Sequence, residues 1–125
     1  MVLNPAESPS EHPFWYARVL GIFHANIIYT GTGMVDYLPR RLEFLWVRWY
    51  ERDNTPAGWR SMRLDRVHFL PIDHEDAFGF IDPADVLRSS HIIPAYAGGK
   101  LRQDGVGISH LSQDFRDWRA YYVNR

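Results

Sequence analysis

The stretch LEFLWVRWYERD, from Leu42 to Asp53, decides the fold that the sequence predicts. It is rich in aromatic residues, contains no proline or glycine and lies between two turn-forming segments, as expected of a β-strand. Apolar residues occupy both faces of this strand. One face holds Leu42, Phe44 and Trp46, and the other holds Leu45, Val47 and Trp49. A strand that is apolar on both faces is expected inside a closed or doubly packed small sheet.

The segments around this stretch also read as short strands. FWYARVLGIFHANIIYT (14–30) predicts one long bent strand or two short ones, with Gly21 where a bulge or a sharp bend costs little. RLDRVHFLPI (63–72) and SSHIIPAYA (89–97) predict two more. Residues 73–86 are expected to form a loop, in which Asp82 before Pro83 caps a single helical turn.

The C-terminal segment SQDFRDWRAYYV, Ser112 to Val123, predicts a closing helix. Ser112 would be its N-cap, and Phe115, Trp118 and Tyr122 would share one apolar face. Short, evenly spaced strands bury their apolar faces by curling the sheet onto itself. The predicted fold is therefore mainly β: a small distorted β-barrel of the SH3-like kind with a C-terminal helix packed on it.

Composition limits the classes of protein that the chain can represent. A length of 125 residues fits one compact domain, and we expect it to span residues 13–125 after a disordered lead-in over residues 1–12 that does not resemble a signal peptide. A formal net charge of -1 gives no global basic field. No apolar run approaches the roughly 20 residues that cross a bilayer, so no membrane partner is predicted. The absence of cysteine excludes disulfides and thiolate zinc sites and fits a reducing compartment.

Motifs for catalysis are missing from the sequence. It has no nucleophile elbow, no zinc-protease helix motif and no phosphate-binding loop, so we predict a protein that is not an enzyme and needs no cofactor. The densest ionisable cluster is DHED, where His74 and Asp76 would share a face of an extended chain. His68 or His91 would have to complete a metal site, and such scattered ligands predict none.

Aromatic residues are the more informative group. Trp15, Tyr16, Trp46, Trp49, Tyr50 and Trp59 are expected on neighbouring strands or at their ends. Aromatic rings beside a carboxylate can enclose a methylated ammonium group, because the ring faces attract the cation. The alternative, that these rings are large core and rim residues, stays open at this point.

The order of these segments resembles the bromo-adjacent homology (BAH) domain, a chromatin module built on a small distorted β-barrel. The similar motifs are FWYARVLGIF in the opening strand, VRWYERD at the end of the central strand, DRVHFLP, the DHED element and DVLRSSHIIPAY. They run in the family's order from about Pro13 to Tyr96. The resemblance implies a nuclear, chromatin-associated module.

The resemblance also implies a set of binding residues. Family members that bind methylated histone tails use aromatic residues matched here by Trp15 and Trp49, and a His-x-Asp pair matched by His74 and Asp76. A further aromatic position of the family is Glu51 here. Tyr50 or Trp59 could supply the third ring instead.

A second resemblance covers nearly the whole chain. RRLEFLWVRWYERD, FGFIDPADVLRSSHIIPAYAGGK and DFRDWRAYYVNR are similar to segments near the C-terminal end of fungal transposon-encoded proteins of the Plavaka and Kyakuja-Dileera-Zisupton groups. This implies a fragment or a free relative of a transposase-associated protein. It is compatible with the first resemblance, since a transposon gains by reading the chromatin state of its target.

Two functions follow as the main hypotheses, and a third, a metal-dependent nuclease fragment, ranks last because its candidate metal ligands are sparse. The first is a non-catalytic module that binds a histone tail or another peptide through Trp15, Trp49, Tyr50, Glu51, Trp59, His74 and Asp76. The alternative is an accessory DNA-binding part of a transposase. Its phosphate contacts would come from Arg40, Arg41, Arg60, Arg63 and Arg66.

Overall fold

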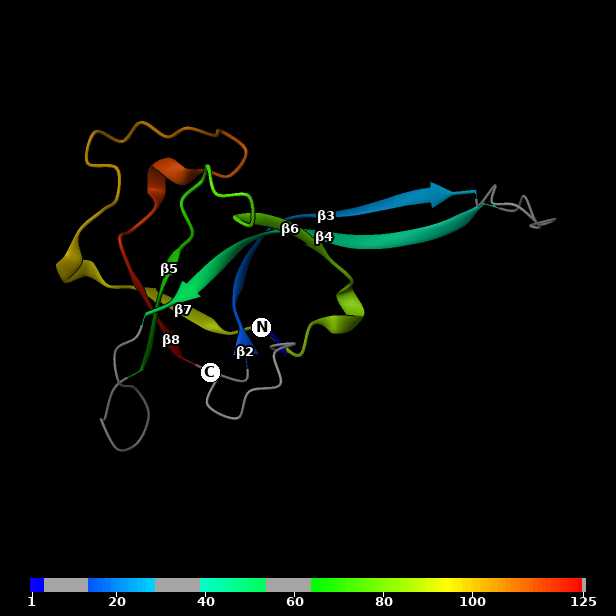
Figure 1. The fold of residues 1–125 in the computed structure, drawn as a ribbon, viewed down its shortest axis with the longest axis horizontal. Helices are drawn as coiled ribbons and strands as arrows, with labels where there is room; N and C mark the ends of the chain where they lie inside the picture. The colour runs from blue at the N-terminus through cyan, green and yellow to red at the C-terminus, as the bar shows by residue number, and fades with distance from the viewer. Residues whose placement is uncertain (4–13, 29–38, 54–63, 125) are drawn as a thin grey trace.

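The computed structural model describes residues 1–3, 14–28, 39–53 and 64–124, and its regular structure is mainly β (Figure 1). The strands are β1 (Val2–Leu3), β2 (Phe14–Trp15), β3 (Ala17–Ile27), β4 (Arg40–Arg52), β5 (Asp65–Phe69), β6 (Phe78–Ile81), β7 (His91–Pro94) and β8 (Tyr121–Asn124). The helical turns in these ranges are of the 3-10 type: η1 (Pro83–Asp85), η2 (Tyr96–Gly98) and η3 (Asp114–Arg116). The predicted β class is confirmed.

Six strands form one curled antiparallel sheet around β4. The order of the main path is β3-β4-β5-β8-β7, and β6 pairs with β4 beside β5. β4 pairs with three strands because it is long. One edge pairs with β3, and on the other edge residues 45–48 pair with β6 and residues 50–52 pair with β5. Within the described residues, no pairing joins the end strands β3 and β7, so the sheet is a curled half-barrel and not a closed one.

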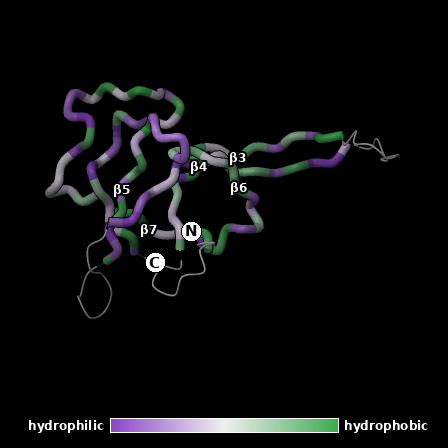
Figure 2. Tube along the Cα trace, in the orientation of Figure 1, coloured by the Kyte–Doolittle hydropathy of each residue, from purple (hydrophilic) through white to green (hydrophobic). Residues whose placement is uncertain are grey.

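A β-bulge bends β3 where the sequence predicted it. The register against β4 shifts between Val19 and Gly21, and a side chain at Gly21 would come within 2.6 Å of the Phe23 ring. The bulge increases the local twist, and beyond it β3 and β4 leave the body as a two-stranded arm (Figure 1). Figure 2 shows that β3 ends in hydrophobic surface at the far end of this arm, where β4 begins with hydrophilic residues.

The core lies under the curl of the sheet. Its buried residues are Tyr16, Val67, Phe69, Tyr121 and Val123. In the body of the protein β4 is covered on both faces, since the neighbouring residues Val47 and Arg48 point to opposite faces and are both buried. The prediction drawn from its two apolar faces holds for this part of the strand only, because Leu42 in the arm is 48% exposed and the sheet is not closed.

The predicted helix over Ser112–Val123 is wrong. Gln113 has a left-handed backbone with φ 53°, which a continuous helix does not tolerate, and the Ser112 hydroxyl donates to the carbonyl of Ser109 instead of capping. After the short turn η3 the chain becomes β8, whose residues are alternately buried and exposed. Pairing with β5 on one edge and β7 on the other stabilises a strand more than a lone twelve-residue helix could stabilise itself.

Two further segments differ from the sequence prediction. Residues 78–81, expected in a loop, form β6 because they find an unpaired edge of β4. Val2 and Leu3, expected in a disordered lead-in, form β1, which pairs with β2 and buries Val2; residues 4–12 of that lead-in lie outside the described residues. The capping prediction is confirmed, since the Asp82 carboxylate accepts a hydrogen bond of 2.9 Å from the Ala84 amide.

Asp114 organises the long loop before β8, and its contacts predict acid sensitivity. Its buried carboxylate accepts hydrogen bonds from the amides of Ile108 and Ser109. Burial opposes ionisation, but these hydrogen bonds and Arg102 prevail and hold the pKa of Asp114 below its usual range. A depressed pKa stabilises the fold above pH about 4, and the stabilisation is lost as the pH falls through the folded-state pKa.

We therefore expect Asp114→Asn to lower the free energy of unfolding at pH 7 by about 1 to 3 kcal/mol and to make it less dependent on pH below about 4. Urea denaturation at pH 7 and at a pH below about 4 measures the free energy of unfolding under both conditions. The matched control is Asp104→Asn, because Asp104 is exposed and accepts a single hydrogen bond, from Val106. Equal losses for the two variants would contradict the prediction.

Candidate functional site

Two tryptophans meet at the surface where β2 and the end of β4 come together. The ring centroids of Trp15 and Trp49 are 5.7 Å apart at an interplanar angle of 78°, an edge-to-face arrangement. Trp15 is 44% exposed and Trp49 is half-buried. Exposed aromatic faces supported by a rigid sheet suit the binding of another molecule. The structure thus brings together the two aromatic residues that the sequence placed at the centre of the site.

A pocket of about 220 Å³ opens beside the two rings. Its wall is mostly apolar and comes from β1, β2, β3, β4, β6, β7 and the segment before β7. The wall includes Val2, Leu45, Val47, Ile81, Val86 and Ile92. None of the described residues that line it is acidic, and Arg88 is the basic one. The pocket is therefore suited to an apolar side chain.

The loop that carries the DHED element is fixed to the backbone of Trp49. The Trp49 amide donates to the Ala77 carbonyl at 2.9 Å, and the Leu70 amide donates to the Trp49 carbonyl at 3.4 Å. Within the loop, the His74 amide donates to the Pro71 carbonyl. These bonds hold the predicted His-x-Asp pair beside the predicted tryptophan.

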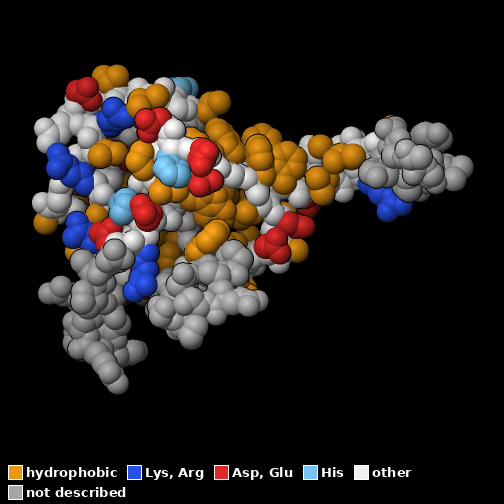
Figure 3. Space-filling model, viewed as in Figure 1, with side chains coloured by type: hydrophobic (Ala, Val, Ile, Leu, Met, Phe, Trp, Pro, Cys, Tyr) orange, Lys and Arg blue, Asp and Glu red, His pale blue; other side chains and the backbone are white. Residues whose placement is uncertain are grey.

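His74 and Asp76 are themselves linked. The Asp76 amide donates to Nδ1 of His74 at 3.0 Å, so the neutral imidazole carries its proton on Nε2 and keeps a donor there. Both side chains are exposed, as are those of Asp73 and Glu75. Figure 3 shows acidic and histidine side chains next to apolar surface where this loop lies in Figure 1. The loop thus carries exposed negative charge on a segment whose ends are hydrogen-bonded to the backbone of Trp49.

Gly79 controls the position of the Trp49 indole. A side chain at Gly79 would come within 2.7 Å of Nε1 of Trp49, so we expect Gly79→Ala to displace the indole and to lower the free energy of unfolding by about 1 to 2 kcal/mol. The indole N–H signal in an NMR spectrum and urea denaturation measure the two effects. Gly98→Ala is the matched control, because a side chain there meets nothing within 4 Å. An unmoved indole signal in Gly79→Ala would contradict the prediction.

The other predicted contacts of the aromatic site lie elsewhere. Tyr50 follows Trp49 in a strand and points to the opposite face, where its ring stacks on Phe69 at 4.1 Å, so the expectation that it joins the tryptophan pair is wrong. Glu51 is paired with Nε2 of His68 at 3.1 Å and does not line the pocket. Trp59 lies outside the described residues.

A buried ionic cluster on the core face of β4 was not predicted. Arg48 and Arg18 each bind one carboxylate oxygen of Asp117. The distance from Arg18 to its oxygen is 3.1 Å. Both guanidinium groups lie over the Phe69 ring, 4.0 and 4.5 Å from its centroid. Arg48 is 2% exposed and Asp117 is fully buried. The sequence offers no signal for this cluster, since Asp117 is 99 and 69 residues away from its partners.

The surroundings of Arg18 keep it charged. Burial alone would lower the pKa of Arg18, but Tyr50, Tyr121 and Asp117 raise it above its ordinary value. Burial also raises the pKa of Tyr50, so this phenol stays neutral. Two permanent positive charges therefore share the single carboxylate of Asp117.

The arginines of the DNA-binding alternative are far apart. Arg40 and Arg41 start β4 at the far end of the arm, whereas Arg66 lies on β5 in the body (Figure 1). Arg41 is 3.5 Å from Glu43, and Arg66 is 3.1 Å from Asp53. Arg60 and Arg63 lie outside the described residues. Among the described arginines, the structure does not form the continuous basic surface that this alternative requires.

Searches for other kinds of site and for relatives gave no assignment. In the described part of the chain, no group of three or more His, Asp or Glu side chains is placed to hold a metal ion, and no helix is long and apolar enough to cross a membrane. Comparisons with models of protein families, with curated proteins and with solved structures found no match. Both resemblances drawn from the sequence therefore stay predictions.

Proposed function

We propose that the chain is a non-catalytic module that binds a basic peptide, such as a histone tail. The observation that carries this proposal is the attachment of the exposed acidic loop, through Ala77 and Leu70, to the backbone of Trp49 beside Trp15. Aromatic faces beside several carboxylates attract lysine and arginine side chains. A chromatin-associated, nuclear role of the kind that the BAH resemblance implies is consistent with this chemistry.

Methylation of a lysine in the peptide is expected to strengthen binding further. A methylated ammonium is large and weakly hydrated, so it gains more from an aromatic face than an unmodified lysine does. The exposed face of Trp15 and the edge-to-face partner Trp49 supply two such surfaces. The neighbouring apolar pocket would receive an aliphatic residue of the same peptide.

The test is a set of binding titrations at two salt concentrations. The ligands are a basic histone-tail peptide with and without a trimethylated lysine, an acidic peptide of equal length and a short DNA duplex. We expect the trimethylated peptide to bind about threefold to tenfold more tightly than the unmodified one, and the acidic peptide not to bind. Tightest binding to the duplex, with a steep loss as salt rises, would refute the proposal and favour the DNA-binding alternative.

A further inference from the structure

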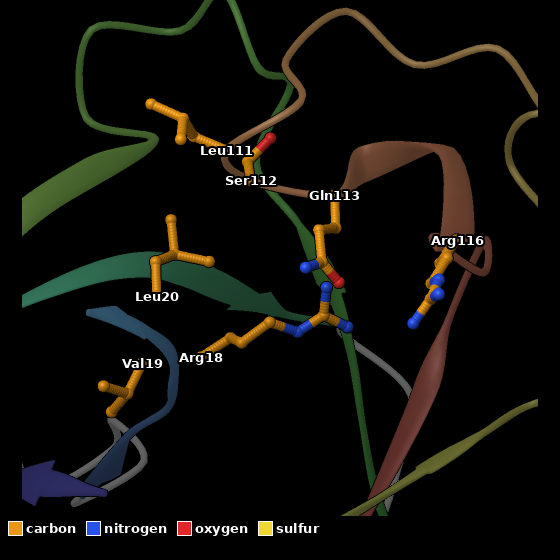
Figure 4. Close-up of a pocket in the computed structure, with 7 residues that line it drawn as sticks. All are labelled: Arg18, Val19, Leu20, Leu111, Ser112, Gln113 and Arg116. Atoms are coloured by element: carbon orange, nitrogen blue, oxygen red, sulfur yellow. The ribbon is translucent and has the colours of Figure 1, made fainter.

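The geometry points to a second binding site, for an anionic group carried on a short apolar chain. A pocket of about 250 Å³ lies between the bulge of β3 and the turn η3 (Figure 4). Its polar wall is formed by Arg18, Gln113 and Arg116, and its apolar wall by Val19, Leu20 and Leu111. This pocket is separate from the tryptophan pair, and the inference does not depend on peptide binding there.

The polar side chains converge on one space. Figure 4 shows the guanidinium groups of Arg18 and Arg116 and the amide of Gln113 pointing toward each other from β3 and the region of η3. The Arg18 side chain is 32% exposed, so a ligand can reach it. The Arg116 guanidinium makes no ion pair with any described residue and lies 5.2 Å from the centroid of the Phe115 ring. None of the described residues that line the pocket is acidic, so Arg116 faces no carboxylate across it, while Arg18 shares Asp117 behind it.

The buried cluster behind the pocket has too little negative charge. Asp117 is shared by Arg18 and Arg48, so two guanidinium groups and one carboxylate leave one positive charge in a mostly buried place. A charge of this kind is stabilised when a further anion pairs with it. The pocket gives such an anion access to Arg18, and Arg116 would bind it from the other side.

The backbone at Gln113 is a second, independent sign. Its φ of 53° and ψ of 36° lie in the left-handed region, which residues other than glycine rarely adopt. Strained residues of this kind are concentrated at binding sites, where the strain holds a side chain in a useful position. Here it holds the Gln113 amide opposite Arg18 (Figure 4). Glycine would fit this backbone better but would supply no amide.

The apolar wall restricts the class of ligand. Leu111 is 74% exposed and Val19 is 50% exposed, although both are aliphatic and lie beside two cations. A free phosphate ion would leave these surfaces in water, whereas a carboxylate or a phosphate monoester with an aliphatic tail would cover them. The ligand class is therefore an amphipathic organic anion.

NMR titrations of the whole chain with simple probes test this inference. The probes are hexanoate, hexyl phosphate, inorganic phosphate and 1-hexanol, at constant ionic strength, with the Arg and Gln side-chain N–H signals as the readout. We expect hexanoate and hexyl phosphate to shift the signals of Arg18, Gln113 and Arg116. The probe that binds more tightly identifies the preferred head group. Binding of inorganic phosphate or hexanol as tight as that of hexyl phosphate would overturn the ligand class.

Three variants separate a built site from general surface charge. Arg116→Gln is expected to weaken binding about tenfold, while Arg119→Gln, an exposed arginine outside the pocket, leaves it unchanged. Gln113→Gly is expected to weaken binding while the melting temperature stays the same or rises. Equal losses for Arg116→Gln and Arg119→Gln, or unchanged binding by Gln113→Gly, would overturn the inference.

Discussion

Replacing Asp117 by alanine is expected to lower the free energy of unfolding by about 3 to 5 kcal/mol, a large part of the total stability of a domain of this size. The carboxylate is fully buried and binds both Arg18 and Arg48. Its removal leaves Arg48, which is 2% exposed, as a buried charge without its carboxylate partner. The cost comes from that desolvated charge more than from the lost contact itself.

Urea denaturation followed by tryptophan fluorescence measures this effect. The matched control is Glu43→Ala, which removes the acid of the exposed pair with Arg41 and should cost less than about 1 kcal/mol. The double variant Arg48→Met, Asp117→Leu replaces the two buried ions by apolar groups and leaves only Arg18, whose side chain is 32% exposed, without its carboxylate, so it should recover part of the loss. If Asp117→Ala lowered the free energy of unfolding no more than Glu43→Ala does, the buried cluster would not stabilise the fold.

The second large effect is expected at the tryptophan pair. Trp49→Ala should weaken binding of a trimethylated basic peptide at least about tenfold, because it removes one of the two ring surfaces and the support of the other. Asp76→Asn should weaken it less, about threefold, since it removes a charge but no ring. Titration calorimetry measures both effects.

The control for Trp49→Ala must separate lost binding from lost stability. Trp46 lies on the same strand, is also half-buried and stacks on Phe78 on the opposite face. Trp46→Ala should therefore lower the free energy of unfolding without a specific loss of peptide affinity. Equal losses of affinity for the two alanine variants would place the binding surface elsewhere.

The strands were predictable where local patterns decide the structure. The two apolar faces of β4 and the glycine at the bulge of β3 are visible in the sequence. The C-terminal segment was not predictable in this way, because the spacing of Phe115, Trp118 and Tyr122 fits a helical face while Tyr121 and Val123 fit a strand. The open edges of β5 and β7 decide between them, and these edges exist only in the folded sheet.

The candidate sites show the same division. Trp15, Trp49, His74 and Asp76 could be named from short motifs; the structure brings the two tryptophan rings together and bonds the loop of His74 and Asp76 to the backbone of Trp49. Tyr50 was misplaced although its position next to Trp49 in a strand already directs it to the other face. The cluster of Arg18, Arg48 and Asp117 was missed because single arginine and aspartate residues far apart in a sequence carry no local pattern.

The place of β8 between β5 and β7 affects how the chain folds during synthesis. Asp117 leaves the ribosome 69 residues after Arg48, which corresponds to roughly 3 to 14 s at ordinary rates of translation. During that interval Arg18 on β3 and Arg48 on β4 have neither the closing strand β8 nor the carboxylate of Asp117. The nascent chain therefore exposes a long aromatic strand for seconds, and chaperones that hold such segments would affect its yield more than its final stability.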